Sequence, residues 1–242
     1  MIANWFSTMP GSLLLSQEKI ILDRLLKASR GDIFLQIGSL HNKDLKNFGW
    51  FKAKCTLRPC NLSFIDEPCI QANLHQLPIE PNSIDVVLVM HQLEIVDQPE
   101  AVLAEIFRVL KPNGRVIITC FNKLSLWQAI KFCRPKNFFP WNSTFYSIGK
   151  VKRWLTRQDF KVTHTSSTEF RFPMKSERLA DKLFFLEILG QFCCSNAGAA
   201  FIMSAYKKVE GVTPLPILKF EKKLPLRGQY IESPASRVYY HD

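Results

Sequence analysis

The sequence lacks the features that mark several classes of protein. No apolar run approaches the ~18 residues that a membrane-spanning helix needs, so no such helix is expected. Residues 1–10 contain no basic stretch of the kind that opens a secretory signal peptide. The chain also has no internal repeat and no CxxC pair. These absences favour a cytoplasmic protein whose 242 residues form one domain with a modest appendage.

The seven cysteines are odd in number and irregular in spacing. A disulfide framework or a zinc site needs a more regular pattern. Cys55, Cys60 and Cys69 are a conceivable set of three metal ligands, but reduced cysteines of a cytosolic protein explain them better. The sequence therefore predicts no bound metal.

The net charge of +11 is unevenly distributed. Residues 66–110 hold eight acidic residues and one basic residue, whereas residues 121–178 hold twelve basic and three acidic residues. The basic stretch indicates either an anionic partner or a positive surface that is simply solvated.

Hydrophobic periodicity predicts alternating strands and helices. The clearest unit is a strand over 84–90, a helix from Pro99 to Leu110 and a strand over 115–121. Asp97 and Glu100 resemble a capping box, and residues 111–114 (KPNG) end the helix. Such a strand–helix–strand unit is nearly always parallel and right-handed. The other expected helices are 16–28, 125–132, 147–156 and 179–189, the other expected strands are 32–38, 51–58, 69–72, 161–165 and 199–206, and 59–68 reads as a loop.

Three segments follow from these patterns. We expect an N-terminal helical segment over residues 1–30 and an α/β domain over residues 31–206. Residues 207–242 carry four prolines and alternating charge, which predicts an extended or disordered basic tail.

Residues 77–121 resemble the central block of the class I S-adenosylmethionine-dependent methyltransferases. That family has a Leu-Pro, a strand that opens with an aromatic-Asp pair, a helix, and RVLKPGG before the next strand. Here the last piece reads RVLKPNG at residues 108–114. The pieces TMPGSLLLSQE, NKLSLW and SAYKKVEGVTPL are similar to a branch of small bacterial, type 11-like methyltransferases of unassigned substrate, which extends the resemblance to about residues 5–216.

The resemblance implies a Rossmann-like, doubly wound and mostly parallel α/β sheet. It also implies S-adenosylmethionine as cofactor and direct in-line transfer of its sulfonium methyl group to an unknown acceptor, which the basic, aromatic segment after residue 121 suggests is anionic or planar. The region around the second strand is shorter than in the family, and the helix that normally follows that strand is missing.

The glycine loop of the family is degenerate in this chain. The family has an acidic residue at the end of its first strand, followed by GxGxG, whose glycines let the backbone approach the cofactor. Here Gln36 stands at the acidic position, Gly38 keeps the first glycine, and Leu40 and Asn42 replace the next two. The resemblance assigns Gln36, Gly38 and Ser39 to the amino-acid end of the cofactor.

The ribose and adenine positions also differ from the family. No acidic residue ends the second strand, and Asp66 and Glu67 come late in the sequence. Asn73 replaces the aspartate that accepts a hydrogen bond from the adenine amino group, and a carboxamide oxygen can still accept it. The resemblance gives Leu74 the role of offering its backbone amide to the adenine.

Met90 and His91 come at the carboxyl end of the fourth strand, where ligands bind in such folds. The resemblance therefore places both beside the cofactor. If the acceptor needs a general base, His91 and Glu94 are the nearest candidates by position, and Tyr146 and His164 are more distant ones. Packing beside the cofactor is the simpler role for His91.

Three hypotheses remain open at this point. The chain is an active methyltransferase, or it is a non-catalytic descendant that uses the fold as a binding or scaffold module. With either, residues 121–178 could bind nucleic acid, although a solvated surface explains them better. The residues that would contact nucleic acid are Lys150, Lys152, Arg153 and Arg157, with Trp141, Phe145 and Tyr146 for stacking.

Overall fold

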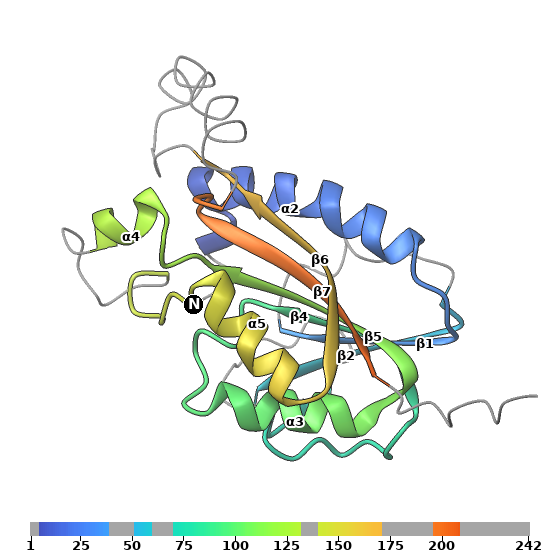
Figure 1. The fold of residues 1–242 in the computed structure, drawn as a ribbon. Helices are drawn as coiled ribbons and strands as arrows, with labels where there is room; N and C mark the ends of the chain where they lie inside the picture. The colour runs from blue at the N-terminus through green and yellow to red at the C-terminus, as the bar shows by residue number, and fades with distance from the viewer. Residues whose placement is uncertain (1–4, 39–50, 60–69, 132–139, 171–195, 209–242) are drawn as a thin grey trace, which may run out of the picture. The chain divides into compact units, whose positions relative to one another are not determined.

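The computed structural model describes residues 5–38, 51–59, 70–131, 140–170 and 196–208 (Figure 1). All of these belong to one compact unit, Met1–Val209. The predicted helix at 179–189 lies outside the described residues, as do residues 209–242 of the predicted tail and all of the predicted loop except Pro59. The predicted start of the tail is wrong at Lys207, which is the last residue of the strand Ala200–Lys207. Within the described residues, no helix is long and apolar enough to cross a membrane.

A seven-stranded sheet forms the centre of the fold, with the strand order β3-β2-β1-β4-β5-β7-β6. All neighbouring pairs are parallel except those of β7, which runs antiparallel to both β5 and β6. The predicted doubly wound, mostly parallel α/β fold is confirmed. The strands are β1 (Ile33–Ile37), β2 (Ala53–Pro59), β3 (Ile70–Ala72), β4 (Ile84–Met90), β5 (Leu110–Phe121), β6 (Phe160–Thr168) and β7 (Ala200–Lys207).

Helices cover both faces of the sheet (Figure 1). Helix α2 (Met9–Lys27) packs on one face, whereas α3 (Pro99–Val109) and α5 (Ile148–Arg157) pack on the other. The position of strand β4 explains why its sequence is a continuous apolar run. Leu88 packs in the hydrophobic core on the face covered by α2, and Val87 and Val89 pack in the core on the face covered by α3. A strand that is buried on both faces needs apolar residues at every position.

Helix α2 begins at Met9, seven residues before the predicted start, with Pro10 in its first turn. Its buried stripe includes Leu14 and Leu22 and also Glu18, an acidic residue. Arg115 of β5 ties the end of α2 to the sheet, because its guanidinium donates to the Leu25 carbonyl oxygen at 2.9 Å.

The unit of strand, helix and strand forms as predicted, with two corrections at its turns. The N-cap of α3 is Gln98 rather than Asp97, and it makes no side-chain capping bond, so the predicted capping box is wrong. Strand β5 begins at Leu110, because that residue already pairs with Ile84 before the register shifts. The KPNG turn lies within this irregular stretch, and Asn113 adopts a φ of 60° there.

Short helix α4 (Leu126–Lys131) follows β5 and confirms most of the helix predicted at 125–132. The helix predicted at 147–156 is α5, whose N-cap Ser147 accepts a hydrogen bond from the Lys150 backbone amide. Strand β2 extends through Pro59, a residue that was assigned to the loop, because Pro59 pairs with Ala72 of β3.

Candidate functional site

The carboxyl ends of β1 and β4 meet at the point where the strand order reverses. From β1 the sheet continues to β2 and β3, whereas from β4 it continues to β5. In open α/β sheets a ligand-binding crevice forms at such a switch point. Gly38 directly follows β1 and Met90 ends β4, so both lie at this position.

The turn at Gly38 accepts no other residue without strain. Its φ is +102°, and a Cβ atom there would lie 2.6 Å from the Met90 carbonyl oxygen and 2.7 Å from Gln92 Nε2. The amide of Gln36 donates to the Gly38 carbonyl oxygen at 3.1 Å. The residue at the family's acidic position therefore holds the glycine turn in place. Ser39 lies outside the described residues.

The end of β3 carries the two residues predicted to meet the adenine. Leu74 is buried and Asn73 is exposed. The carboxamide oxygen of Asn73 accepts a hydrogen bond from the His75 backbone amide at 3.0 Å, and it has a second lone pair. The arrangement leaves this oxygen able to accept one further hydrogen bond.

The described strand β2, Ala53–Pro59, contains no aspartate or glutamate. Asp66 and Glu67, the late acidic residues, lie outside the described residues, as do Cys60 and Cys69. The described residues therefore include a glycine turn and a carboxamide acceptor at positions that the resemblance assigns to the cofactor, and the described strand β2 supplies no carboxylate for its ribose.

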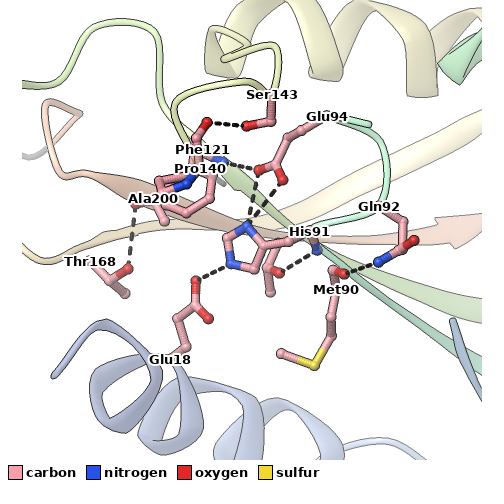
Figure 2. A network of polar contacts seen from close by, with 11 residues as sticks. Glu18, Met90, His91, Gln92, Glu94, Phe121, Pro140, Ser143, Thr168 and Ala200 are labelled. Atoms are coloured by element: carbon pink, nitrogen blue, oxygen red, sulfur yellow. Dashed lines mark hydrogen bonds and ion pairs between the residues drawn. The ribbon is translucent and has the colours of Figure 1, made fainter. Parts of the chain in front are cut away.

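A buried cluster of three ionisable side chains, those of Glu18, His91 and Glu94, lies at the carboxyl end of β4 (Figure 2). His91 Nε2 is 3.0 Å from Glu18 Oε1, and His91 Nδ1 is 3.0 Å from Glu94 Oε1. All three side chains are at most 1% exposed. Glu94 also accepts a hydrogen bond from the backbone amide of Phe121, which links the ends of β4 and β5.

The two carboxylates determine the charge of His91. Burial alone would lower the pKa of this histidine, but the negative charges of Glu94 and Glu18 outweigh burial and raise the pKa to about 10. His91 is therefore a cation near neutral pH, with both ring N–H groups donating to carboxylates. In this arrangement it has no lone pair with which to accept a proton, and the geometry supports the packing role over that of a base.

Sequence reasoning missed Glu18, which contributes one of the two carboxylates. One signal was present: Leu14, Glu18 and Leu22 follow at intervals of four residues, so Glu18 lies in the apolar stripe of α2. An acidic residue in such a stripe needs a buried partner. That partner, His91, lies 73 residues away in the sequence.

Of the more distant candidate bases, Tyr146 lies near Glu94 of this cluster and His164 lies away from it. Tyr146 is buried against Trp154, with ring centroids 4.8 Å apart, and burial raises its pKa. His164 is exposed on β6, the edge strand of the sheet. The structure does not bring His164 to the ends of β1 and β4.

The basic face of α5 is partly engaged within the chain. The Lys150 ammonium lies 5.0 Å from the ring centroids of Tyr146 and Trp154, and Arg157 is 3.8 Å from Glu100. Contact of this face with a polyanion stays a prediction.

Comparison with known proteins gives the same fold. The profile of a methyltransferase domain family matches residues 52–118, a stretch that begins after the Gly38 turn. Among solved structures, a methyltransferase from Thermotoga maritima has a TM-score of 0.63 at 18% identity, covering 85% of this chain and 94% of its own. One from Archaeoglobus fulgidus has a TM-score of 0.55 at 16% identity, covering 78% and 93%.

Sequence relatives match over shorter stretches. The demethylmenaquinone methyltransferase of Lactococcus lactis is 35% identical over 107 residues, which are 42% of each chain. The uncharacterized protein YafS of Escherichia coli is 32% identical over 98 residues, 40% of this chain and 41% of its own length. The chain thus spans about two fifths of the length of these relatives.

The strand order, with an antiparallel β7 between β5 and β6, is that of the class I methyltransferase fold. The fold that the resemblance implied is thus confirmed, and residues 52–118 match the profile of a methyltransferase domain.

Proposed function

We propose that this protein is a methyltransferase that binds S-adenosylmethionine at the carboxyl ends of β1 and β4. The observation that carries the proposal is the Gly38 turn: a glycine with φ of +102°, held by Gln36, at the switch point of the sheet. Bound there, the cofactor would supply a sulfonium methyl group for an acceptor to take by direct in-line attack on the methyl carbon, with the neutral thioether as the leaving group.

The chain's own contribution to such a transfer is to position the two reactants. An in-line displacement with a good leaving group gains most from holding nucleophile and methyl carbon in line. Gly38 permits a close backbone approach, and Leu74 offers an apolar side chain and a backbone amide beside the adenine. The acceptor would lie toward the end of β5, past the buried cluster.

A planar ring is the acceptor class that we test first. The relative from L. lactis is named a demethylmenaquinone methyltransferase. Rings also gather at the end of β5, where Phe121 stacks on Phe145 at 5.0 Å between centroids and on Trp127 at 6.0 Å. These three rings are buried in the core, so a planar acceptor would lie above them and not against their faces.

A non-catalytic module is the second candidate. It is favoured by the side chain of Gln92, whose amide donates to the Met90 carbonyl oxygen at 3.2 Å and lies against Gly38. The position that a cofactor would approach is thus already in contact with a protein side chain.

Calorimetric titration of the full chain with S-adenosylmethionine and S-adenosylhomocysteine separates the two. We expect both to bind, and Gly38→Val to abolish binding because its Cβ would clash with the Met90 backbone. Gly149→Ala is the matched control, since a Cβ there meets nothing within 4 Å. No heat of binding at millimolar concentration would overturn the proposal in favour of the module.

A further inference from the structure

The turn after β4 is held in an unusual conformation by the side chain of its own first residue. His91 has a φ of 48°, a left-handed value that costs a residue with a Cβ about 1 kcal/mol or more. Its backbone amide donates to the Thr119 carbonyl oxygen at 3.1 Å, and both ring nitrogens contact carboxylates. The side-chain contacts of His91 therefore over-determine this strained turn.

The strained turn contacts the proposed cofactor position through the side chain of Gln92. The next residue, Gln92, is 1% exposed and lies with its amide nitrogen 2.7 Å from where a Gly38 Cβ would be. A rotation of the backbone at His91 would move Gln92 into the Gly38 turn or away from it. The shape of that turn thus depends on how His91 is anchored.

One of the two anchors comes from a distant element. Glu18 lies on α2, which covers the face of the sheet that Leu88 and Met90 also face. Its Oε1 meets His91, and its Oε2 is buried without a hydrogen-bond partner among the described residues. A fully buried carboxylate with one unsatisfied oxygen is costly, and its retention indicates a role that an apolar residue could not fill.

We infer that Glu18 is a positioning residue of the cofactor site, acting through the His91 ring on the turn that holds Gln92 against Gly38. The inference rests on the proposed function, because it assumes that the Gly38 turn receives the cofactor. Glu18 does not touch the cofactor in this scheme. It keeps His91 a cation that donates to carboxylates on both sides.

Removing the charge of Glu18 changes the state of His91. Besides Glu94, which keeps its contact with His91, the titratable groups around the cluster are Cys120 and Tyr146; burial raises the pKa of both, so both are neutral near pH 7. In Glu18→Gln the imidazolium would keep one carboxylate instead of two, and the pKa of His91 would fall below 10. The turn would then loosen as the pH rises through the lowered pKa.

The test is the affinity for S-adenosylhomocysteine of the full chain and of Glu18→Gln, measured by calorimetry at pH 6.5 and pH 8.5. We expect about tenfold weaker binding in the variant at pH 6.5, in the range found for residues that act through neighbours. The ratio to the unmodified chain should grow at pH 8.5. Because both proteins meet the same ligand, titration of the ligand itself cancels in the ratio.

Two further variants separate positioning from loss of folding. Glu100→Gln removes an exposed carboxylate of α3 that pairs with Arg157 of α5, and it should leave affinity unchanged. Glu18→Asp keeps the charge on a shorter side chain, and this variant should bind S-adenosylhomocysteine more tightly than Glu18→Gln does. Nitrogen-15 spectra of the histidine rings, assigned by the signal lost in His91→Asn, should show His91 titrating at a lower pH in Glu18→Gln than in the unmodified chain.

The outcomes are distinct. If the unmodified chain binds and Glu18→Gln binds equally well at both pH values, the inference is wrong and the proposed function stands. If affinity follows thermal stability across all variants regardless of charge, Glu18 is a purely structural residue and the inference is again wrong. If the unmodified chain binds no S-adenosylhomocysteine, the proposed function itself fails and the inference fails with it.

Discussion

The two ends of strand β4 both carry ion pairs, but the pairs differ in depth. At the amino end, Asp85 pairs with Lys111 at 2.8 Å, and these side chains are 18% and 36% exposed. At the carboxyl end, His91 pairs with Glu18 and Glu94, and no side chain of the three is more than 1% exposed. Burial of charge is much more costly at the second end.

The amino end explains the motif on which the resemblance depends. Arg108 of RVLKPNG donates to the carbonyl oxygens of Leu77 and Ile79 at 3.0 Å each, and Lys111 binds Asp85. Asp85 in turn accepts from the Ile33 backbone amide at 3.0 Å, at the start of β1. The motif therefore joins β1, β4 and β5 at the amino end of β4, and it also holds the segment that follows Leu74.

The comparison teaches that the motif carrying the family resemblance and the proposed cofactor site lie at opposite ends of the same strand. The amino end uses partly exposed ion pairs to hold elements together, and these tolerate some loss. The carboxyl end buries three ionisable side chains beside a strained turn. This arrangement lowers stability relative to an apolar core, which favours a functional role for it. Five predictions test this difference.

The largest effect should follow His91→Asn. Asparagine tolerates the positive φ, so the substitution removes the cation with little backbone strain. It leaves two buried carboxylates without a positive partner, and we expect the free energy of unfolding to fall by about 3–5 kcal/mol. Urea denaturation measures this; a loss below 1 kcal/mol would mean that the two ends of β4 are alike.

Alkaline pH should weaken the carboxyl end. Because His91 has a pKa of about 10 when folded against 6.5 when unperturbed, its contribution is complete below pH 6.5 and is lost as the pH rises toward 10. The free energy of unfolding should fall by up to about 1.4 kcal/mol per pH unit between pH 7 and pH 9. His91→Asn should lack this slope, and equal slopes in both proteins would contradict the assignment.

Acid should weaken the amino end, with a smaller amplitude. Partial burial tends to raise the pKa of Asp85, but hydrogen bonds from Lys111 and from the amides of Ile33 and Asp32 lower it overall. Its contribution is therefore present above about pH 4 and is lost as the pH falls further. Asp85→Asn should cost about 1–2 kcal/mol at pH 7 and flatten the acid side of the stability profile.

The same variant sharpens the comparison through ligand binding. Because Asp85 lies at the opposite end of β4 from Gly38, Asp85→Asn should leave the affinity for S-adenosylhomocysteine within about twofold. A tenfold loss would show that the amino end also shapes the site.

The smallest effect is expected from Gly149→Ala, which lies at neither end of β4. Gly149 is exposed in the first turn of α5, where an added Cβ meets no other atom within 4 Å. Alanine should raise the free energy of unfolding by about 0.5 kcal/mol through better helix propensity. Thermal unfolding measures the gain, and a loss would indicate a contact that this face makes in solution.

Much of the fold was predictable because burial imposes local patterns. The bounds of β4 are those predicted, since a strand buried on both faces must be apolar throughout. The start of α2 was not predictable from the sequence. Gly11 approaches Trp5 so closely that a Cβ on Gly11 would lie 2.3 Å from the Trp5 carbonyl oxygen, and helical periodicity does not reveal this packing. The capping box at Asp97 failed because Gln98 takes the N-cap position.

The candidate site divides in the same way. The amino acids alone placed Gly38 and His91 at the ends of buried strands, because the ends of strands are marked by local sequence. Only the tertiary structure decided that Glu18 meets His91, since a contact across 73 residues depends on how α2 packs on the sheet. The charge of a side chain at a site depends on such distant partners. The sequence indicates that Glu18 needs a buried partner, but it does not identify which residue that partner is.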